Sequence, residues 1–364
     1  MDIIIVGGGL AGCALAWQCR SRGLRIKLID QPRADSASRV AAGLVTPVTG
    51  SRFAVSWRWT EFFPDADALY RHAEWQSGES FWSVAPAWRA FTSYEEATFC
   101  NQRCLTPGNL IEKAGIRIEV LPAARLPASL ADGGGISMEP AARLDVPAYL
   151  DATRRVLEVE DMLVSIDLDV DRDLHPQTDR IEIPRLGLAS RWAVLCQGFL
   201  ARTNRWFSGL PLHPARGDIL LIRSPGLQLD HVLHHKGWIV PLPGEQYLMG
   251  ATYDRHALTM DGDDDAATRW RADLCQRWTA MTGQEFNTRD AEILGHRIAI
   301  RPATYDRHPL IGAHSRCPHL WCLNGLGSKG SLMAPRLASH LMDSMLGGHP
   351  IDASLILSRR SFSE

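Results

Sequence analysis

The chain begins with an apolar run that leads directly into a cluster of glycines. Residues 1–6 are mostly β-branched, which predicts a buried parallel strand. Gly7, Gly9 and Gly12 follow with the G-x-G-x-x-G spacing, in which the glycines permit a tight turn, close approach of backbone to a pyrophosphate, and packing of a helix on the strand. The N-terminal segment is therefore constrained to a βαβ unit that delivers a helix N-terminus to an anionic ligand.

The residues after the turn complete this unit. Leu10, Cys13 and Trp17 share one face of a predicted helix. The run 24–29 predicts a second strand, which ends at Asp30, at about the ~20-residue offset of an acid that binds a ribose hydroxyl. A glycine motif alone is weak evidence, but strand, glycines, amphipathic helix, strand and acid in this order predict a dinucleotide cofactor.

A second glycine cluster lies near the other end of the chain. Residues 320–324 predict a strand, the segment 325–330 (Gly-Leu-Gly-Ser-Lys-Gly) follows, and a helical pattern begins near Ser331. Two such clusters indicate one long cofactor held at both ends, and FAD fits this best. Backbone amides of the second cluster would stabilise negative charge on reduced flavin. Lys329 either adds a positive charge there or points to solvent.

Composition excludes several other classes. The chain has 364 residues and a formal net charge of -2, which lacks the electrostatic footprint of nucleic-acid binding, so we do not expect a nucleic-acid partner. No apolar stretch approaches the ~18–20 residues of a membrane span. Because the glycine turn starts at Gly7, no signal peptide is expected before it, and the 8 cysteines fit reduced thiols in a cytoplasmic protein. The neighbouring His231, His234 and His235 lack metal-ligand spacing, so no metal site is predicted.

The order of the elements predicts an α/β fold with a discontinuous cofactor domain. Residues 191–198 form a buried run ending in glycine, typical of a return to the first sheet, whereas alternating strands dominate from residue 218 onward. We expect a Rossmann-like FAD-binding domain of the glutathione-reductase type and a mainly antiparallel β-sheet substrate domain. The expected FAD-binding segments are 1–50, 140–213 and 296–364, and the expected substrate-domain segments are 51–139 and 214–295.

Several motifs together resemble the D-amino-acid oxidase and glycine oxidase superfamily of flavoproteins over essentially the whole chain. The matching segments are Ser-x-x-Ala-Ala-Gly-Leu at 38–44, Leu-Cys-Gln-Gly at 195–198, Pro-x-Arg-Gly-Asp at 214–218, Trp-Ile-Val-Pro at 238–241, Gly-Ala-Thr at 250–252 and Arg-Pro-Ala-Thr-Tyr-Asp-Arg-His-Pro-Leu-Ile-Gly at 301–312. The last is the most specific. The second glycine cluster is most similar to the flavin half of the bifunctional enzyme that modifies the tRNA wobble uridine.

This resemblance implies FAD and hydride transfer from the carbon bearing a substrate amine to flavin N5. Some relatives attach FAD covalently through His or Cys, but nothing in this sequence marks an attaching residue, so we expect non-covalent FAD. The residues expected to bind FAD are Gly7, Gly9, Leu10, Ala11, Asp30, Gln31, Ala42, Gly43, Leu44, Cys196, Gly198, Arg301, Gly325, Gly327, Ser328, Lys329, Gly330 and Ser331. Arg301 is the expected catalytic clamp for a substrate carboxylate, with a structural ion pair to Glu292 or Asp306 as the alternative. Trp238 is expected beside it, where amino-acid oxidases have Tyr.

Three functions remain open at this point. The first is an FAD-dependent oxidase or dehydrogenase acting on a small amine or amino acid, with oxygen or an unknown compound as electron acceptor. The second is a flavin enzyme acting on an aminomethyl or glycine-like side chain of modified tRNA. The third is a flavin subunit that passes electrons to a partner or quinone. The substrate and the oligomeric state do not follow from the sequence.

Overall fold

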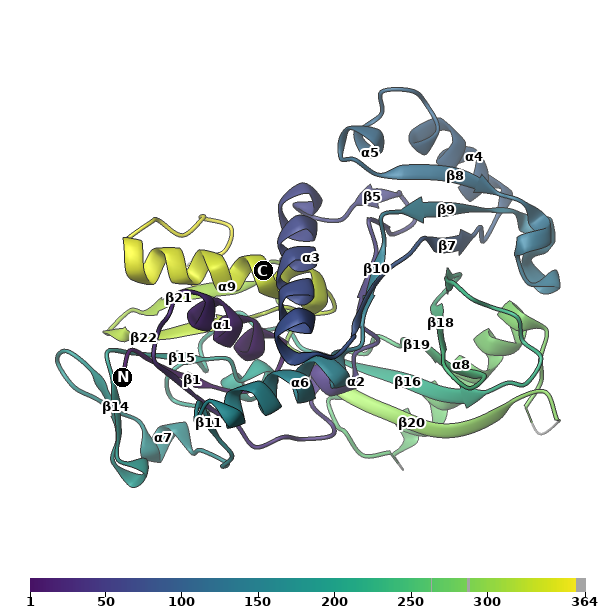
Figure 1. Ribbon diagram of the computed structural model, residues 1–364. Coiled ribbons are helices and arrows are strands. Elements are labelled where there is room, and N and C mark those ends of the chain that lie inside the picture. The colour runs from purple at the N-terminus through teal and green to yellow at the C-terminus, as the bar shows by residue number, and fades with distance from the viewer. Residues whose placement is uncertain (263, 287–288, 358–364) are drawn as a thin grey trace.

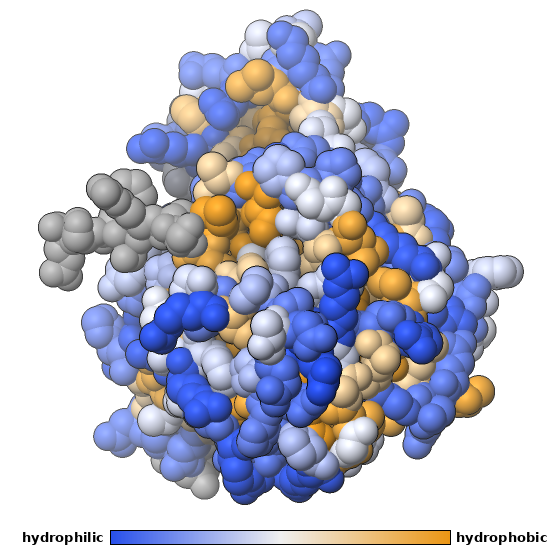
Figure 2. Space-filling view, turned by 90° about the vertical axis from the view of Figure 1, so that its left-hand side faces the viewer, coloured by the Kyte–Doolittle hydropathy of each residue, from blue (hydrophilic) through white to orange (hydrophobic). Residues whose placement is uncertain are grey.

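The structure is a computed structural model that describes residues 1–262, 264–286 and 289–357 (Figure 1). Two large sheets dominate it, one surrounded by helices near the N-terminus and one extending to the other side of the molecule. Among the described helices, none is both long and apolar enough to cross a membrane. On the face drawn in Figure 2, hydrophilic side chains prevail and apolar ones are interspersed among them.

The first sheet has six strands drawn from distant parts of the chain. In order these are β11 (Leu163–Val164), β2 (Ile26–Ile29), β1 (Ile3–Val6), β15 (Trp192–Leu195), β22 (Cys317–Asn324) and β21 (Leu310–His314). All neighbours pair in parallel except β21 with β22. β1 is central and wholly buried, which confirms the Rossmann-like sheet predicted from its β-branched run.

Alternation along β1 divides the surroundings of this sheet into two apolar cores. Ile3 and Ile5 join a core with the helices α1 (Leu10–Ser21) and α9 (Gly330–Gly347). Ile4 points to the other face, where a smaller core lies under a three-stranded sheet. Both glycine clusters therefore enter helices that cover the same face of one sheet, and these helices contact each other.

The second sheet has eight strands. In order these are β20 (Glu292–Arg301), β16 (Ala215–Arg223), β19 (Gln246–Gly250), β18 (Trp238–Leu242), β17 (Val232–His234), β7 (Ala87–Ala90), β9 (Gly135–Glu139) and β8 (Arg117–Leu121). Only β17 and β7 pair in parallel, so the sheet is mainly antiparallel, as predicted. Its strands come from both segments expected to form the substrate domain, and the expected boundary at 295/296 falls inside β20.

The two faces of this sheet have different environments. Leu220 and Ile222 of β16 pack toward the helix α8 (Asp265–Thr282). Ile219, which directly precedes Leu220, points to the other face and packs with Val40 and Ala42 of the N-terminal part of the chain. The face of the sheet that carries Ile219 therefore packs against the segment around α2.

The remaining elements are shorter or peripheral. The other strands are β3 (Leu44–Val45), β10 (Ala142–Leu144) and β6 (Trp82–Val84), which form one sheet; β12 (His175–Pro176), β13 (Ile181–Ile183) and β14 (Leu188–Ser190), which form another; and the pair β4 (Val48–Thr49) and β5 (Ala54–Val55). The other helices are α2 (Ala37–Val40), α3 (Trp59–Ser77), α4 (Tyr94–Cys104), α5 (Leu110–Lys113), α6 (Val146–Val159) and α7 (Val170–Asp173).

Candidate active site

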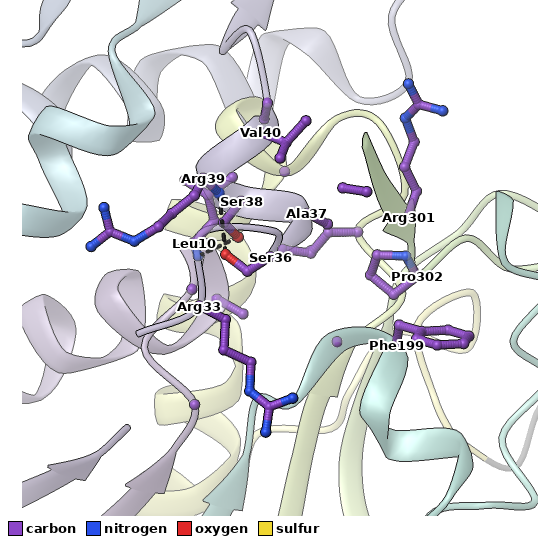
Figure 3. A pocket seen from close by; sticks show the side chains of 18 of the residues that line it. Leu10, Arg33, Ser36, Ala37, Ser38, Arg39, Val40, Phe199, Arg301 and Pro302 are labelled. Atoms are coloured by element: carbon purple, nitrogen blue, oxygen red, sulfur yellow. Dashed lines mark hydrogen bonds between the residues drawn. The ribbon is translucent and has the colours of Figure 1, made fainter. Parts of the chain in front are cut away.

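A long cavity starts at the carboxyl ends of the parallel strands and continues along the second sheet (Figure 3). Of the predicted site residues, those in its wall are Gly7, Gly9, Leu10, Ala11, Asp30, Gln31, Ala42, Gly43, Leu44, Cys196, Gly198, Trp238, Arg301, Gly327, Ser328, Gly330 and Ser331. Gly325 and Lys329 do not belong to the wall. The carboxyl edge of a parallel sheet is where open α/β folds bind ligands.

The first glycine turn has no room for side chains. A Cβ at Gly12 would lie 1.8 Å from the carbonyl oxygen of Gly7, and one at Gly7 would lie 2.6 Å from that of Cys196. Gly7 also has a φ of +104°, which favours glycine. The turn ends at Gly9, where α1 begins without a side-chain cap on the helix terminus. This close-packed cradle at a helix N-terminus fits the pyrophosphate of FAD.

Asp30 directly follows β2 at the cavity wall, and its carboxylate already accepts two hydrogen bonds. Its Oδ1 accepts a hydrogen bond from the Gly8 amide at 2.8 Å, and its Oδ2 accepts one from Arg154 Nη1 at 2.8 Å. A carboxylate accepts several hydrogen bonds, so capacity remains for a ribose hydroxyl. The sequence did not indicate Arg154, which comes from α6.

The short helix α2 supplies a contact that we did not predict. Ser38 Oγ accepts a hydrogen bond from the Leu10 amide at 3.1 Å, so the hydroxyl lies at the N-terminus of α1 (Figure 3). Ser36 caps α2 by accepting from the Arg39 amide. Both serines line the cavity. The resemblance around residues 38–44 was the available signal for Ser38.

Cys196 and Gly198 form the middle of the wall. Burial raises the pKa of the Cys196 thiol well above its usual value, so the side chain stays protonated and contributes to packing. Gly198 has a φ of +56°, and its carbonyl accepts a hydrogen bond from Asn324 Nδ2 at 2.9 Å. This bond joins the turn after β15 to the end of β22.

The second glycine cluster presents the start of α9 to the cavity. Gly327, with a φ of +54°, and Ser328 line the wall just before the helix. Ser331 in the first turn of α9 is held from behind, because its carbonyl accepts a hydrogen bond from the buried Tyr70 hydroxyl at 2.9 Å. A second helix N-terminus therefore faces the same cavity, which suits a developing anion.

The Lys329 side chain is largely buried and directed at Ser56. Its Nζ donates a hydrogen bond to Ser56 Oγ at 2.8 Å, and Ser56 in turn donates to the Thr46 carbonyl at 2.6 Å. Burial lowers the pKa of Lys329 to about 8. Among the described residues no carboxylate pairs with it. The ammonium thus fastens the loop after β3 to the start of α9.

Arg301 at the end of β20 is a largely buried cation that has no acidic partner among the described residues. Its Nη1 donates to the carbonyls of Arg216 at 3.2 Å and Thr252 at 3.1 Å. Within the described part of the chain it forms no ion pair, and Glu292, one of the alternatives from sequence, pairs with Arg223 instead. Burial lowers the pKa of Arg301. An anion in the cavity would offset the cost of burying this charge.

The guanidinium of Arg301 lies directly on Gly217. A Cβ at Gly217 would be 2.0 Å from Arg301 Nη2. On the neighbouring strands, the indole of Trp238 lies over Gly250, where a Cβ would be 2.6 Å from the ring. Each functional side chain therefore occupies space that a glycine leaves open. Trp238 belongs to the cavity wall, and an indole can donate one hydrogen bond.

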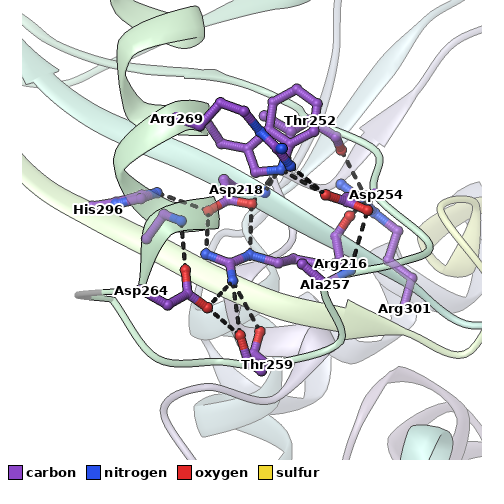
Figure 4. A network of polar contacts seen from close by, with 12 residues as sticks. Arg216, Asp218, Thr252, Asp254, Ala257, Thr259, Asp264, Arg269, His296 and Arg301 are labelled. Carbon is purple, nitrogen blue, oxygen red and sulfur yellow. Dashed lines mark hydrogen bonds and ion pairs between the residues drawn. The ribbon is translucent and has the colours of Figure 1, made fainter.

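A buried charge network lies on the opposite face of β16 (Figure 4). Arg216 Nε and Nη2 donate to the two oxygens of Asp218, each at 3.1 Å, and both side chains are 0% exposed. Asp218 also contacts His296 Nε2 at 3.0 Å and accepts from Thr252 Oγ1 at 2.9 Å. Arg216 Nη1 reaches Asp264 at 2.8 Å. The motif at 214–218 contains Arg216 and Asp218, but no pattern in the sequence links them to Arg301.

Next to Arg301, aromatic and cationic side chains gather at the surface. Tyr253, 50% exposed as a residue, has Arg301 Cζ at 5.7 Å and Arg255 Cζ at 5.5 Å from its ring centre. Arg255 Nη1 lies 2.9 Å from His213 Nδ1, and His213 in turn packs on Tyr305 with ring centres 4.0 Å apart. We call His213, Tyr253, Arg255 and Tyr305 the aromatic rim.

Comparison with known proteins gives consistent results. The family described as FAD dependent oxidoreductase matches residues 2–344. The tRNA 5-methylaminomethyl-2-thiouridine biosynthesis bifunctional protein MnmC of Caulobacter sp. (strain K31) is 30% identical over 355 residues, covering 94% of this chain and 54% of that protein. The bifunctional protein ThiO/ThiG of Nostoc sp. is 24% identical over 369 residues, covering 94% and 52%. The chain thus spans about half the length of these relatives.

Solved structures share the fold. Glycine oxidase from Geobacillus kaustophilus superposes with a TM-score of 0.78 at 20% identity, covering 99% of both chains. Iminodiacetate oxidase from Chelativorans sp. gives 0.74 at 20% identity, covering 96% of both chains. At this identity the likeness concerns the fold alone.

Proposed function

Because this chain belongs to the family of FAD-dependent oxidoreductases, we propose that it oxidises an amine that carries a carboxylate. The observation that carries this proposal is Arg301, a buried guanidinium in the cavity wall with two backbone contacts and no acidic partner among the described residues. A guanidinium binds a carboxylate through paired hydrogen bonds, which fixes the direction of the Cα–H bond.

The residues divide the work in this proposal. Gly7, Gly9 and Asp30 hold the adenosine and pyrophosphate portion, and Gly327 with Ser328 meets the flavin end. Bound FAD supplies the hydride acceptor. The N-terminus of α9 stabilises the negative charge that accumulates on reduction. Trp238 and Arg301 then enclose the substrate on the side of the second sheet.

Direct reduction of the holoenzyme tests this. Glycine, iminodiacetate and larger amino acids are mixed anaerobically with the protein, and loss of visible flavin absorbance identifies substrates. Arg301→Ala should lose about 30-fold or more in kcat/KM with FAD content unchanged, as for removal of one partner of a desolvated charge pair. Arg301→Lys should also be poor, because it keeps the charge but not the planar fork. Near-normal turnover by Arg301→Ala would remove the carboxylate from the proposal.

The electron acceptor is the second part of the test. Hydrogen peroxide formed in air with a substrate favours an oxidase. Reoxidation by dyes or quinones alone favours a dehydrogenase or a subunit that passes electrons to a partner.

A second candidate is oxidation of a glycine-like or aminomethyl side chain on tRNA. The aromatic rim favours it, because exposed aromatic rings stack on bases and arginines contact phosphates. The relative from Caulobacter also acts, by its name, in tRNA 5-methylaminomethyl-2-thiouridine biosynthesis. Flavin bleaching by undermodified tRNA but not by free amino acids, weakened by salt and by Arg255→Ala, would support this candidate. Bleaching by free amino acids with no affinity for tRNA would reject it.

A further inference from the structure

The side chain of Arg301 is aligned by groups on the far face of the sheet that holds it. Strand alternation places Gly217 on the cavity face of β16 and Arg216 and Asp218 on the α8 face. The carbonyls that accept from Arg301 Nη1 belong to Arg216 and Thr252. The position of the guanidinium therefore depends on how firmly these backbone segments are held.

Asp218 holds both segments together. Its backbone amide donates to Thr252 Oγ1 at 2.8 Å, and its carboxylate accepts from the same hydroxyl at 2.9 Å. The carboxylate also accepts both arms of the Arg216 fork. Burial alone would raise the pKa of Asp218, but hydrogen bonds from His296, Arg216 and Thr252 keep this pKa below its usual value. The carboxylate is thus ionised and fully engaged.

A buried ion pair is an inefficient source of stability, because desolvation offsets most of its attraction. The pair of Arg216 and Asp218 instead fixes the orientation of the backbone carbonyls that hold Arg301. Arg301 Nη1 is anchored on two carbonyls, whereas its Nε and Nη2 have no hydrogen-bond partner among the described residues. A guanidinium held by one nitrogen leaves an edge of its fork for an incoming carboxylate.

We infer that Asp218 and Thr252 are positioning residues, which align Arg301 for the anion through the Thr252 hydroxyl without touching the substrate. This inference rests on the proposed function of Arg301. Thr252 is 2% exposed and does not line the cavity, so its hydroxyl acts through the backbone it holds. The contacts form one path from Arg216 and Asp218 through Thr252 to Arg301 (Figure 4).

The experiment measures carboxylate binding, not turnover. Acetate is titrated into the FAD-loaded protein, and its dissociation constant is taken from the change in the flavin absorbance spectrum. Thr252→Val keeps the shape of the side chain and removes the hydroxyl. It should weaken acetate binding about tenfold, the scale of one misaligned hydrogen bond to a charged group. Thr252→Ser restores the hydroxyl and should bind within about twofold of the native protein.

Asp173→Asn is the matched control for Asp218→Asn. Asp173 is also a buried carboxylate held by two arginines, Arg172 and Arg185, but it lies in α7, outside the cavity wall. Asp218→Asn should weaken acetate binding as Thr252→Val does, and Asp173→Asn should not. FAD content and melting temperature verify that each variant is folded. If Asp218→Asn does not fold, the valine and serine pair at position 252 decides.

The outcomes separate this inference from the proposed function. No saturable acetate response in the native protein would refute the carboxylate site at Arg301, and the positioning role with it. An acetate response that Arg301→Ala abolishes but Thr252→Val leaves unchanged would retain the proposed function and overturn the positioning role alone.

Discussion

Replacing Gly217 by alanine should move the Arg301 guanidinium without changing any charge. The new Cβ would lie 2.0 Å from Nη2, 2.2 Å from Cζ and 2.3 Å from Nη1, whereas real Cβ atoms essentially never come within 3.0 Å of another heavy atom. The guanidinium must therefore retreat by about 1 Å, and a displacement of this size at a reacting centre costs ~100-fold in rate. The backbone at Gly217 lies outside the left-handed region, so alanine adds no backbone strain.

The corresponding energy is about 2.8 kcal/mol at ~1.4 kcal/mol per decade. This is consistent with stretching the hydrogen bonds of Nη1, which are already 3.1 and 3.2 Å long, since a bond to a charged group contributes ~1.5–3 kcal/mol. kcat/KM for the best amine found in the anaerobic screen should fall accordingly, with FAD content unchanged. Gly295→Ala is the control, because its Cβ would meet only Leu221 Cβ at 3.9 Å on the same sheet. A Gly217→Ala protein within about threefold of native kcat/KM would refute the reasoning.

Three further predictions concern the cofactor cradle, the buried lysine and the cavity wall. Gly12→Ala should purify without visible flavin absorbance, because its Cβ would lie 1.8 Å from the Gly7 carbonyl oxygen. Gly209→Ala is the control, because its Cβ would meet nothing within 4 Å, and it should retain FAD. Equal FAD content in both variants would contradict this prediction. The pKa of Lys329 is about 8 in the folded protein and 10.5 when unfolded, so the unfolded state binds more protons between these pH values. The free energy of unfolding of the apoprotein, measured in urea relative to Lys329→Met, should therefore rise by up to about 3 kcal/mol between pH 8 and pH 10.5. A difference that is flat with pH would mean that Lys329 is solvated. Trp238→Ala should raise kcat/KM for bulky amines relative to glycine, and an unchanged ratio would place the substrate elsewhere.

The sequence predicted those parts of the site that depend on local pattern. The strand, turn and helix around Gly7 follow from β-branching and glycine spacing, and the structure confirms the resulting parallel sheet. The mainly antiparallel character of the second sheet was also predicted, from the succession of short strands after residue 218. The roles of the individual site residues stay predictions.

Side-chain direction could not be obtained in the same way. Lys329 lies between two residues of the cavity wall, yet its ammonium reaches Ser56, a distant residue whose loop has no recognisable pattern. Arg154 approaches Asp30 from a helix more than a hundred residues away. Gly217 is required by a guanidinium from another strand. Such long-range contacts depend on packing, which no local window of sequence contains.

The parallel sheet also has a consequence for how the protein is made. Its central registers align Ile5 with Val194 and Val194 with Trp321, so neighbouring strands leave the ribosome far apart in time. β15 cannot pair with β22, and α9 cannot pack on the sheet, until both of these later elements have been synthesised. Contacts between residues so distant in sequence slow folding. A nascent chain in which β22 has not yet been synthesised contains the first glycine turn but not the second. Cofactor capture is therefore expected only after translation has passed α9.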